Sequence, residues 1–91
     1  MKYFITLSDK AQTDLAETND YYSKKSHSLL DRFWNDLDQT LVRLSENPLQ
    51  FQERYKGNRI IFLEHFPFGV HYFLEETKIE VFRILHTKRK F

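Results

Sequence analysis

The sequence contains no cysteine, only two glycines and two prolines, and no hydrophobic run long enough to cross a membrane. Without cysteine there is no disulfide framework, no thiol nucleophile and no thiolate metal site, which fits a reducing compartment, so we expect a cytoplasmic protein. The scarcity of glycine and proline argues against a loop-rich or disordered chain. Polar side chains interrupt the first residues too early for the apolar segment of a signal peptide, so we expect a soluble, unprocessed protein.

Apolar and aromatic residues are plentiful. The 91 residues are 41% hydrophobic and 16% aromatic, which is enough for one core and too few for two, so we expect a single domain over residues 1–91. The net charge of +1 is unevenly distributed: residues 1–47 carry six basic and eight acidic side chains, and residues 48–91 carry eight and five. A basic carboxyl-terminal half favours an acidic partner, either protein or nucleic acid.

The first quarter of the chain predicts a strand followed by a helix. Residues 2–7 alternate between two faces, and Ser8-Asp9 supplies a helix N-cap with an acid in the first turn. A narrow stripe at helical spacing then follows, formed by Ala11, Leu15, Thr18 and Tyr22. This helix should pack on one face and leave Asp14, Glu17 and Asp20 in water.

A second helix is predicted after the polar segment 23–28. Ser28 and Asp31 resemble a capping box, and Asn47-Pro48 ends the helical spacing. The apolar positions of this helix are Leu30, Phe33, Trp34, Leu37, Leu41 and Leu44. Because the link between the helices is short, we expect them to form an antiparallel hairpin.

After Pro48 the pattern changes to that of strands. The segments are residues 51–55, 59–65, 70–74 and the stretch from Ile79 to His86. Hairpin turns are predicted at 56–58 and 75–78, and residues 66–69 interrupt the apolar run. The predicted fold class is α+β: an N-terminal strand, an antiparallel two-helix hairpin, then a mainly antiparallel four-strand meander, with the first strand in or beside the sheet.

The junction at the end of the last predicted strand is the best candidate for a site. His86 and the basic cluster of Lys88, Arg89 and Lys90 follow an apolar strand that can fix their position. Strict alternation from Ile79 would place either Arg83 or His86 beside apolar neighbours unless a β-bulge intervenes.

Each of these side chains also has a structural interpretation. His86 and Arg83 can be hydrogen-bonded sheet residues, and the basic cluster can be a solvated tail. His65 and His71 have no third ligand at convincing spacing, so we expect neither a metal site nor a cofactor.

Taken in order, these segments resemble the RelE/ParE superfamily of type II toxins over nearly the whole chain. The matching segments are Leu7-Ser8-x-x-Ala11-x-x-Asp14-Leu15, Tyr21-Tyr22, Asn47-Pro48, Arg59, Phe66-Pro67-Phe68-x-Val70-x-Tyr72, Ile79-x-Val81 and Ile84-x-His86-x-x-Arg89. The resemblance implies a toxin held inactive by a cognate antitoxin in a hetero-oligomer, in a pair that commonly represses its own promoter.

The superfamily contains two activities. RelE-like members resemble ribonucleases that cut mRNA in the ribosome, and for that chemistry this chain offers Glu53 as base, Arg59 and Arg83 as phosphate clamps, and His86 as acid. ParE-like members are similar in fold and poison DNA gyrase without nuclease groups. The Tyr21-Tyr22 end of the first helix and the close of the last strand look more ParE-like.

Three hypotheses therefore follow. A ParE-like toxin would bind gyrase through His86 and the cluster from Lys88 to Lys90, and would stop DNA synthesis first. A RelE-like ribonuclease would stop translation and depend on His86 and Arg59. An inactive or orphan domain would be non-toxic. In each case an antitoxin segment rich in acidic and apolar residues would order on the sheet or the helix hairpin.

Overall fold

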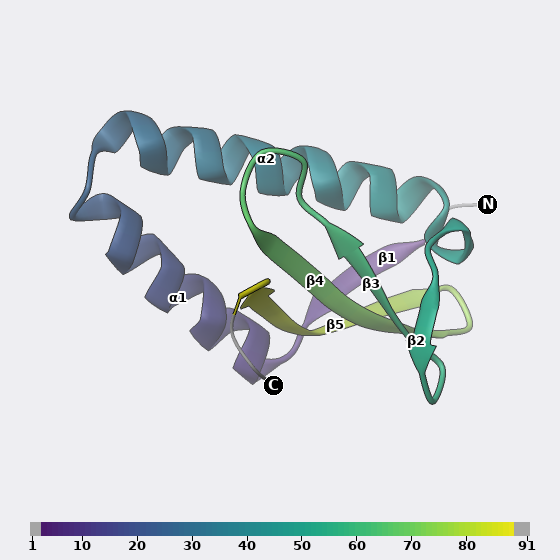
Figure 1. Ribbon diagram of the computed structural model, residues 1–91. Coiled ribbons are helices and arrows are strands. Elements are labelled where there is room, and N and C mark those ends of the chain that lie inside the picture. The colour runs from purple at the N-terminus through teal and green to yellow at the C-terminus, as the bar shows by residue number, and fades with distance from the viewer. Residues whose placement is uncertain (1–2, 89–91) are drawn as a thin grey trace.

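The computed structural model describes residues 3–88. The elements in chain order are β1 (Phe4–Leu7), α1 (Asp9–Ser23), α2 (His27–Glu46), a short 3-10 helix η1 (Pro48–Gln50), β2 (Glu53–Tyr55), β3 (Asn58–Phe62), β4 (Phe68–Glu75) and β5 (Lys78–His86) (Figure 1). The two long helices diverge from their short link, and the sheet lies in the opening between them (Figure 1). Neither helix of this described range combines the length and apolarity that crossing a membrane requires.

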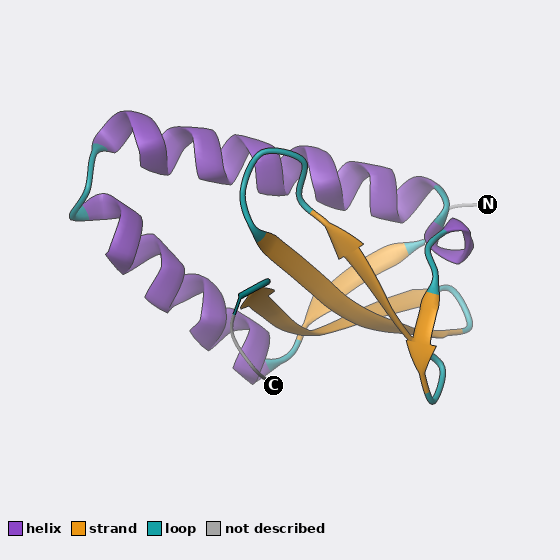
Figure 2. Cartoon of the chain, viewed as in Figure 1, coloured by secondary structure: helices purple, strands orange, loops and turns teal. Residues whose placement is uncertain are grey.

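The strands form one sheet in the order β1-β5-β4-β3-β2 (Figure 2). The neighbours from β5 to β2 are antiparallel, whereas β1 runs parallel to β5 at the edge. The predicted α+β class, with its N-terminal strand, helical hairpin and four-strand meander, is confirmed. Because β1 precedes the helices and β5 follows the other strands, elements from the two ends of the described chain lie side by side.

Helix α1 begins where the sequence predicts. The Ser8 hydroxyl accepts a hydrogen bond from the backbone N–H of Ala11 at 3.1 Å, which satisfies one of the free donors at the helix start. Glu17 and Asp20 are exposed, as predicted. Asp14 is only 8% exposed, so the prediction that it lies in water is wrong.

The N-cap of helix α2 lies two residues before the predicted cap. The N-cap is Ser26, whose hydroxyl accepts from the backbone N–H of Leu29 at 3.0 Å. Ser28 is already inside the first turn, so the predicted capping box of Ser28 with Asp31 is wrong. The earlier serine is the cap because its backbone is extended, the conformation that an N-cap requires.

The core lies between the helices and one face of the sheet. Its most deeply buried side chains, each 2% exposed or less, are Ala11, Phe33, Leu37, Leu44, Ile61, Val70, Tyr72, Ile79, Val81 and Ile84. Phe33 packs edge-on against Phe66 and Phe68, with ring centroids 5.6 and 5.3 Å away. The Tyr72 hydroxyl donates to the carbonyl of Pro48 at 2.6 Å, and burial raises the pKa of Tyr72 to about 12. This hydrogen bond ties the centre of the sheet to the segment that follows α2.

The loop between β3 and β4 is held by a carboxylate from α2. Asp36 is 3% exposed, and its oxygens accept from the backbone N–H groups of Glu64 at 3.3 Å, His65 at 2.8 Å and Phe66 at 3.1 Å. These donors bond the carboxylate instead of a strand, so β3 ends at Phe62 rather than continuing to His65 as predicted.

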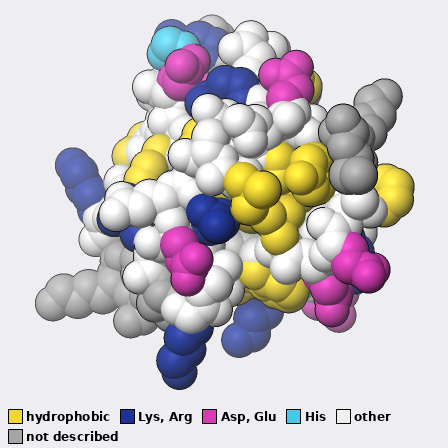
Figure 3. Space-filling model, turned by 90° about the vertical axis from the view of Figure 1, so that its right-hand side faces the viewer, with side chains coloured by type: hydrophobic (Ala, Val, Ile, Leu, Met, Phe, Trp, Pro, Cys, Tyr) yellow, Lys and Arg dark blue, Asp and Glu magenta, His cyan; other side chains and the backbone are white. Residues whose placement is uncertain are grey.

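The opposite face of the sheet also carries apolar side chains, and no helix of the described chain packs over them. Phe62 is 45% exposed, and Ile60, Phe73 and Phe82 are partly exposed. Hydrophobic side chains also reach the surface near β2 and the β4–β5 turn, where Figure 3 shows them among acidic and basic groups.

Candidate functional site

A β-bulge in β5 decides how the end of this strand is oriented. Tyr72 of β4 pairs with Val81, but the preceding His71 pairs with Arg83, so Phe82 is the extra residue. The bulge resolves the conflict that strict alternation creates. Ile84 returns to the core face, and Arg83 points to the start of α1.

Arg83 is held by the buried carboxylate of Asp14. The Arg83 Nε and Nη2 atoms donate to the two Asp14 oxygens at 2.8 and 3.0 Å, and the backbone N–H of Ile84 donates to the same carboxylate at 2.9 Å. The hydrogen bond to Asp14 raises the pKa of Arg83, with burial opposing it. A phosphate would therefore have to compete with a bidentate carboxylate for this guanidinium, which weakens the predicted role of Arg83 as a phosphate clamp.

Next to this pair lies His71, which is 5% exposed. Burial lowers the pKa of His71, the positive charge of Arg83 lowers it further, and Asp14 acts in the opposite direction. We therefore place His71 in the packing around the bulge rather than in a solvent-facing site.

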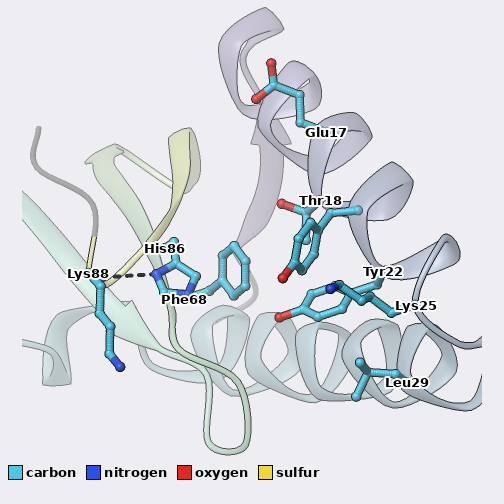
Figure 4. Close-up of a pocket in the computed structure, with 9 residues that line it drawn as sticks. Glu17, Thr18, Tyr22, Lys25, Leu29, Phe68, His86 and Lys88 are labelled. Atoms are coloured by element: carbon cyan, nitrogen blue, oxygen red, sulfur yellow. Dashed lines mark hydrogen bonds between the residues drawn. The ribbon is translucent and has the colours of Figure 1, made fainter.

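His86 lines an open cavity of about 650 Å³ between α1 and the end of β5 (Figure 4). Its ring packs edge-on against Phe68, with centroids 5.2 Å apart. The backbone N–H of Lys88 donates to His86 Nδ1 at 3.2 Å. This contact assigns the acceptor role to Nδ1, so in the neutral ring the proton is on Nε2. The predicted position of His86 on a rigid strand end, beside a basic residue, agrees with this geometry.

The other wall of the cavity comes from the last turns of α1. Tyr21 and Tyr22 line it together with Lys25 from the link that follows the helix, and the Lys25 ammonium lies 5.1 Å from the centre of the Tyr21 ring. Tyr21 is 56% exposed and Tyr22 only 8%. Burial raises the pKa of Tyr22, and Tyr21 adds to the effect. The cavity thus combines an aromatic floor with cations at its rim.

The charges around this cavity are mostly positive. Among the described residues that line it, Lys25 and Lys88 are basic and Glu17 is acidic (Figure 4). Arg89 and Lys90, which the sequence adds to the same cluster, lie outside the described residues. An aromatic and cationic surface of this kind is suited to an acidic partner surface with apolar side chains.

Glu53 and Arg59 lie elsewhere, where β2 and β3 pair. Glu53 is opposite Arg59, with 3.9 Å between Glu53 Oε1 and Arg59 Nη2, and Glu53 Oε2 accepts from the backbone N–H of Gly57 at 2.9 Å. Arg59 also donates to the carbonyl of Phe51 at 2.6 Å. Both side chains therefore have local partners that fix the β2–β3 hairpin.

The four predicted nuclease residues do not converge. Arg59 pairs with Tyr72, and His86 pairs with Phe68, four residues away along β4. At about 3.3 Å per residue and 4.8 Å per strand, the backbones of Arg59 and His86 are about 16 Å apart. Glu53 is one strand further still. The predicted acid His86 and base Glu53 are thus further apart than Arg59 and His86, whereas an acid and a base for one phosphodiester must both lie within hydrogen-bond reach of it.

Within residues 3–88 no three His, Asp or Glu side chains are grouped closely enough to hold a metal ion. His65 and His71 are on different elements, His65 in the β3–β4 loop and His71 in β4.

Sequence reasoning missed part of this site. The wall formed by Tyr21 and Lys25 was not predicted, and Asp14 was assigned to solvent. A signal for Asp14 does exist, because it lies three residues after Ala11 and four before Thr18, on the buried face of α1. A carboxylate inside such a stripe requires a buried partner, and here that partner is Arg83.

Comparisons with known proteins agree with the fold and identify the family. The family model of the ParE toxin of the type II toxin–antitoxin system parDE matches residues 5–91. A solved structure described as the chromosomal ParDE TA system from P. aeruginosa superimposes with a TM-score of 0.79 at 22% identity, covering 97% of this chain and 98% of that one. Nothing among curated proteins matches. The resemblance to the RelE/ParE superfamily, on its ParE-like side, is confirmed: this chain belongs to the ParE toxin family of type II toxin–antitoxin systems.

Proposed function

We propose that residues 1–91 act as a single toxin domain that arrests bacterial growth by binding DNA gyrase in the cytoplasm. A cognate antitoxin, in a hetero-oligomer, would neutralise it. Family membership supports the toxin role, and the geometry of the candidate residues favours binding over RNA cleavage.

The observation that carries this proposal is the separation of the nuclease candidates. Arg83 is occupied by Asp14, Arg59 by the carbonyl of Phe51, and His86 is at the other end of the sheet from Glu53. A toxin that acts by binding needs no converging acid and base. It needs a surface, and the cavity at the end of β5 provides one.

The proposed contact surface consists of His86 and Lys88 together with Arg89 and Lys90, which the sequence places next to them. Its cations would meet acidic groups of the target, and the neighbouring aromatic rings would exclude water from those contacts. Charge complementarity at such a surface mainly sets the association rate and the specificity.

Controlled expression of the chain in a bacterial host tests the proposal. Labelled thymidine and methionine are followed during the first minutes after induction. We expect DNA synthesis to fail first, with induction of the DNA-damage response. Lys88→Glu should weaken the arrest because it reverses the charge of the contact surface. Lys24→Glu is the matched control, since Lys24 is an exposed lysine that forms a surface ion pair with Asp20.

An assay with purified components tests whether DNA gyrase itself is the target. With DNA gyrase, ATP and relaxed plasmid, we expect the wild-type chain to inhibit supercoiling and Arg59→Ala to inhibit equally well. Translation failing first, with arrest abolished by Arg59→Ala and His86→Ala in folded protein, would instead support the RelE-like ribonuclease. No arrest from soluble, folded protein would support the inactive domain.

The antitoxin partner is tested by genetics and co-purification. We expect a short neighbouring reading frame whose product, rich in acidic and apolar residues, restores growth when co-expressed and elutes with the toxin as one complex. Restored growth without a stable complex would argue against neutralisation by direct binding.

A further inference from the structure

The face of the sheet opposite the core carries apolar side chains and two shallow hollows. Phe73 and Phe82 lie with ring centroids 5.9 Å apart, and the Arg54 guanidinium lies 5.7 Å from the centre of the Phe62 ring. A methyl group at Gly69 would lie 3.1 Å from a side-chain carbon of Ile60 and 3.2 Å from the Phe62 ring. Glycine therefore lets these side chains lie flat across β4. Partly exposed apolar side chains gathered in this way usually mark an interaction surface.

Charge divides this face into two ends. At the end where β5 finishes, two shallow hollows share Ile60, His71 and Leu85. Arg54 lines one of them, Lys10 and Asp9 line the other, and Lys88 follows the strand. At the other end, acidic side chains gather around the β4–β5 turn. They are Glu75, Glu76 and Glu80, with Lys78 between them. The apolar middle is thus bounded by a basic end and an acidic end.

We propose that a second copy of this chain covers the face, so that the free protein forms a two-fold symmetric dimer through its outer sheet surface. A two-fold axis in the plane of the interface and perpendicular to the strands reverses the strand direction of the partner. The basic end of each copy then meets the acidic end of the other, and the aromatic pairs meet at the centre. An axis parallel to the strands would place like charges together, so charge selects the first arrangement.

The size of the face sets the strength of the dimer. Five strands about 4.8 Å apart and eight residues of β4 at about 3.3 Å each give a flat footprint of about 500 Å². A standard stable interface buries about 800 Å² per partner, so this one is at the weak end. The dimer should therefore form reversibly, with a dissociation constant in the micromolar range, and dissociate on dilution.

Sedimentation equilibrium of the full-length chain, from about 1 to 500 μM, tests this proposal over the range that a weak interface requires. We expect the mass to rise from 11.2 kDa towards twice that value. Phe62→Asp should raise the dissociation constant by at least about tenfold, because it replaces an apolar ring at the basic end with an acidic group that would face the acidic end of the partner. Val42→Asp is the matched control: Val42 is 56% exposed on α2, away from this face, and should leave the dimer unchanged.

Charge exchange tests the orientation. Lys10→Glu alone and Glu76→Lys alone should each weaken the dimer, and the double variant should restore it, because the two ends meet across the axis.

A chain that stays monomeric throughout the concentration range, or a dimer weakened equally by Val42→Asp and Phe62→Asp, overturns the proposal. So does a monomer whose Phe62 becomes protected only when antitoxin is added, since the face then belongs to that partner. None of these measurements depends on toxicity.

Discussion

Replacing Asp14 with alanine tests whether the first helix and the last strand are joined by one buried carboxylate. The change removes three hydrogen bonds, two from Arg83 and one from the backbone N–H of Ile84. Ile84 is 2% exposed, so its N–H loses its acceptor where water is scarce, at a cost of about 1–3 kcal/mol. The Arg83 side chain is 36% exposed and can turn to water, so its share is only about 1 kcal/mol.

We therefore expect Asp14→Ala to lower the free energy of unfolding by about 2–4 kcal/mol. In a domain of this size each kcal/mol lowers Tm by about 4–8 °C, so the change is large against a total stability of about 5–15 kcal/mol. Urea unfolding followed by circular dichroism measures it. The reference is Asp20→Ala, which breaks an exposed i,i+4 pair with Lys24 at 3.1 Å and should cost less than about 0.5 kcal/mol.

A double-mutant cycle of Asp14→Ala with Arg83→Met isolates the pair itself. We expect a coupling energy of about 1 kcal/mol, with most of the Asp14→Ala cost remaining in the Arg83→Met background because the Ile84 N–H is still unpaired. Equal destabilisation by Asp14→Ala and Asp20→Ala would refute this account of α1 and β5.

Three further outcomes follow from the buried polar groups. Asp36→Ala should destabilise the fold by about 2–4 kcal/mol and speed hydrogen exchange at residues 64–66, whereas the exposed Asp38→Ala should do neither. The pKa of Tyr72 is about 12 in the folded state and about 10 in the unfolded state, so its contribution to the free energy of unfolding is complete below pH 10 and is lost as pH rises towards 12. Tyr72→Phe should therefore make the urea midpoint of unfolding less dependent on pH between 10 and 12. An unchanged dependence of the midpoint on pH would contradict this. The pKa of His71 measured by NMR of the imidazole should lie below 6.5, so its contribution to the free energy of unfolding is present above pH 6.5 and declines at lower pH. A titration midpoint at or above pH 6.5 would contradict the burial of His71.

The local elements were predictable because their signals are local. The helical spacing of apolar residues located α2, and Ser8 marked the start of α1. The turn predicted around Gly57 is also present, and Lys56 and Gly57 adopt positive φ angles there. These features depend on residues a few positions apart, which a sequence displays directly.

The details of the site were not predictable because they depend on distant partners. Asp14 and Arg83 are 69 positions apart, so nothing near Asp14 shows that its partner exists. The bulge at Phe82 depends on how β4 pairs with β5, and a one-residue shift there exchanges the faces of every later side chain. The cavity around His86 likewise needs α1 to lie beside the end of β5.

The pairing of β1 with β5 also constrains the order of folding. The helical hairpin and the β3–β4–β5 meander are made of neighbours in sequence, so they can form quickly. β1 pairs only with β5, more than 70 positions later, and its placement must await that strand. Closing so long a loop costs conformational entropy, and the hydrogen bonds that offset this cost form only when both strands are present. Until then the apolar face of β1 is uncovered and the neighbouring edge of β5 is unpaired, so docking of β1 is expected to be a late step, before which the chain is most prone to aggregate.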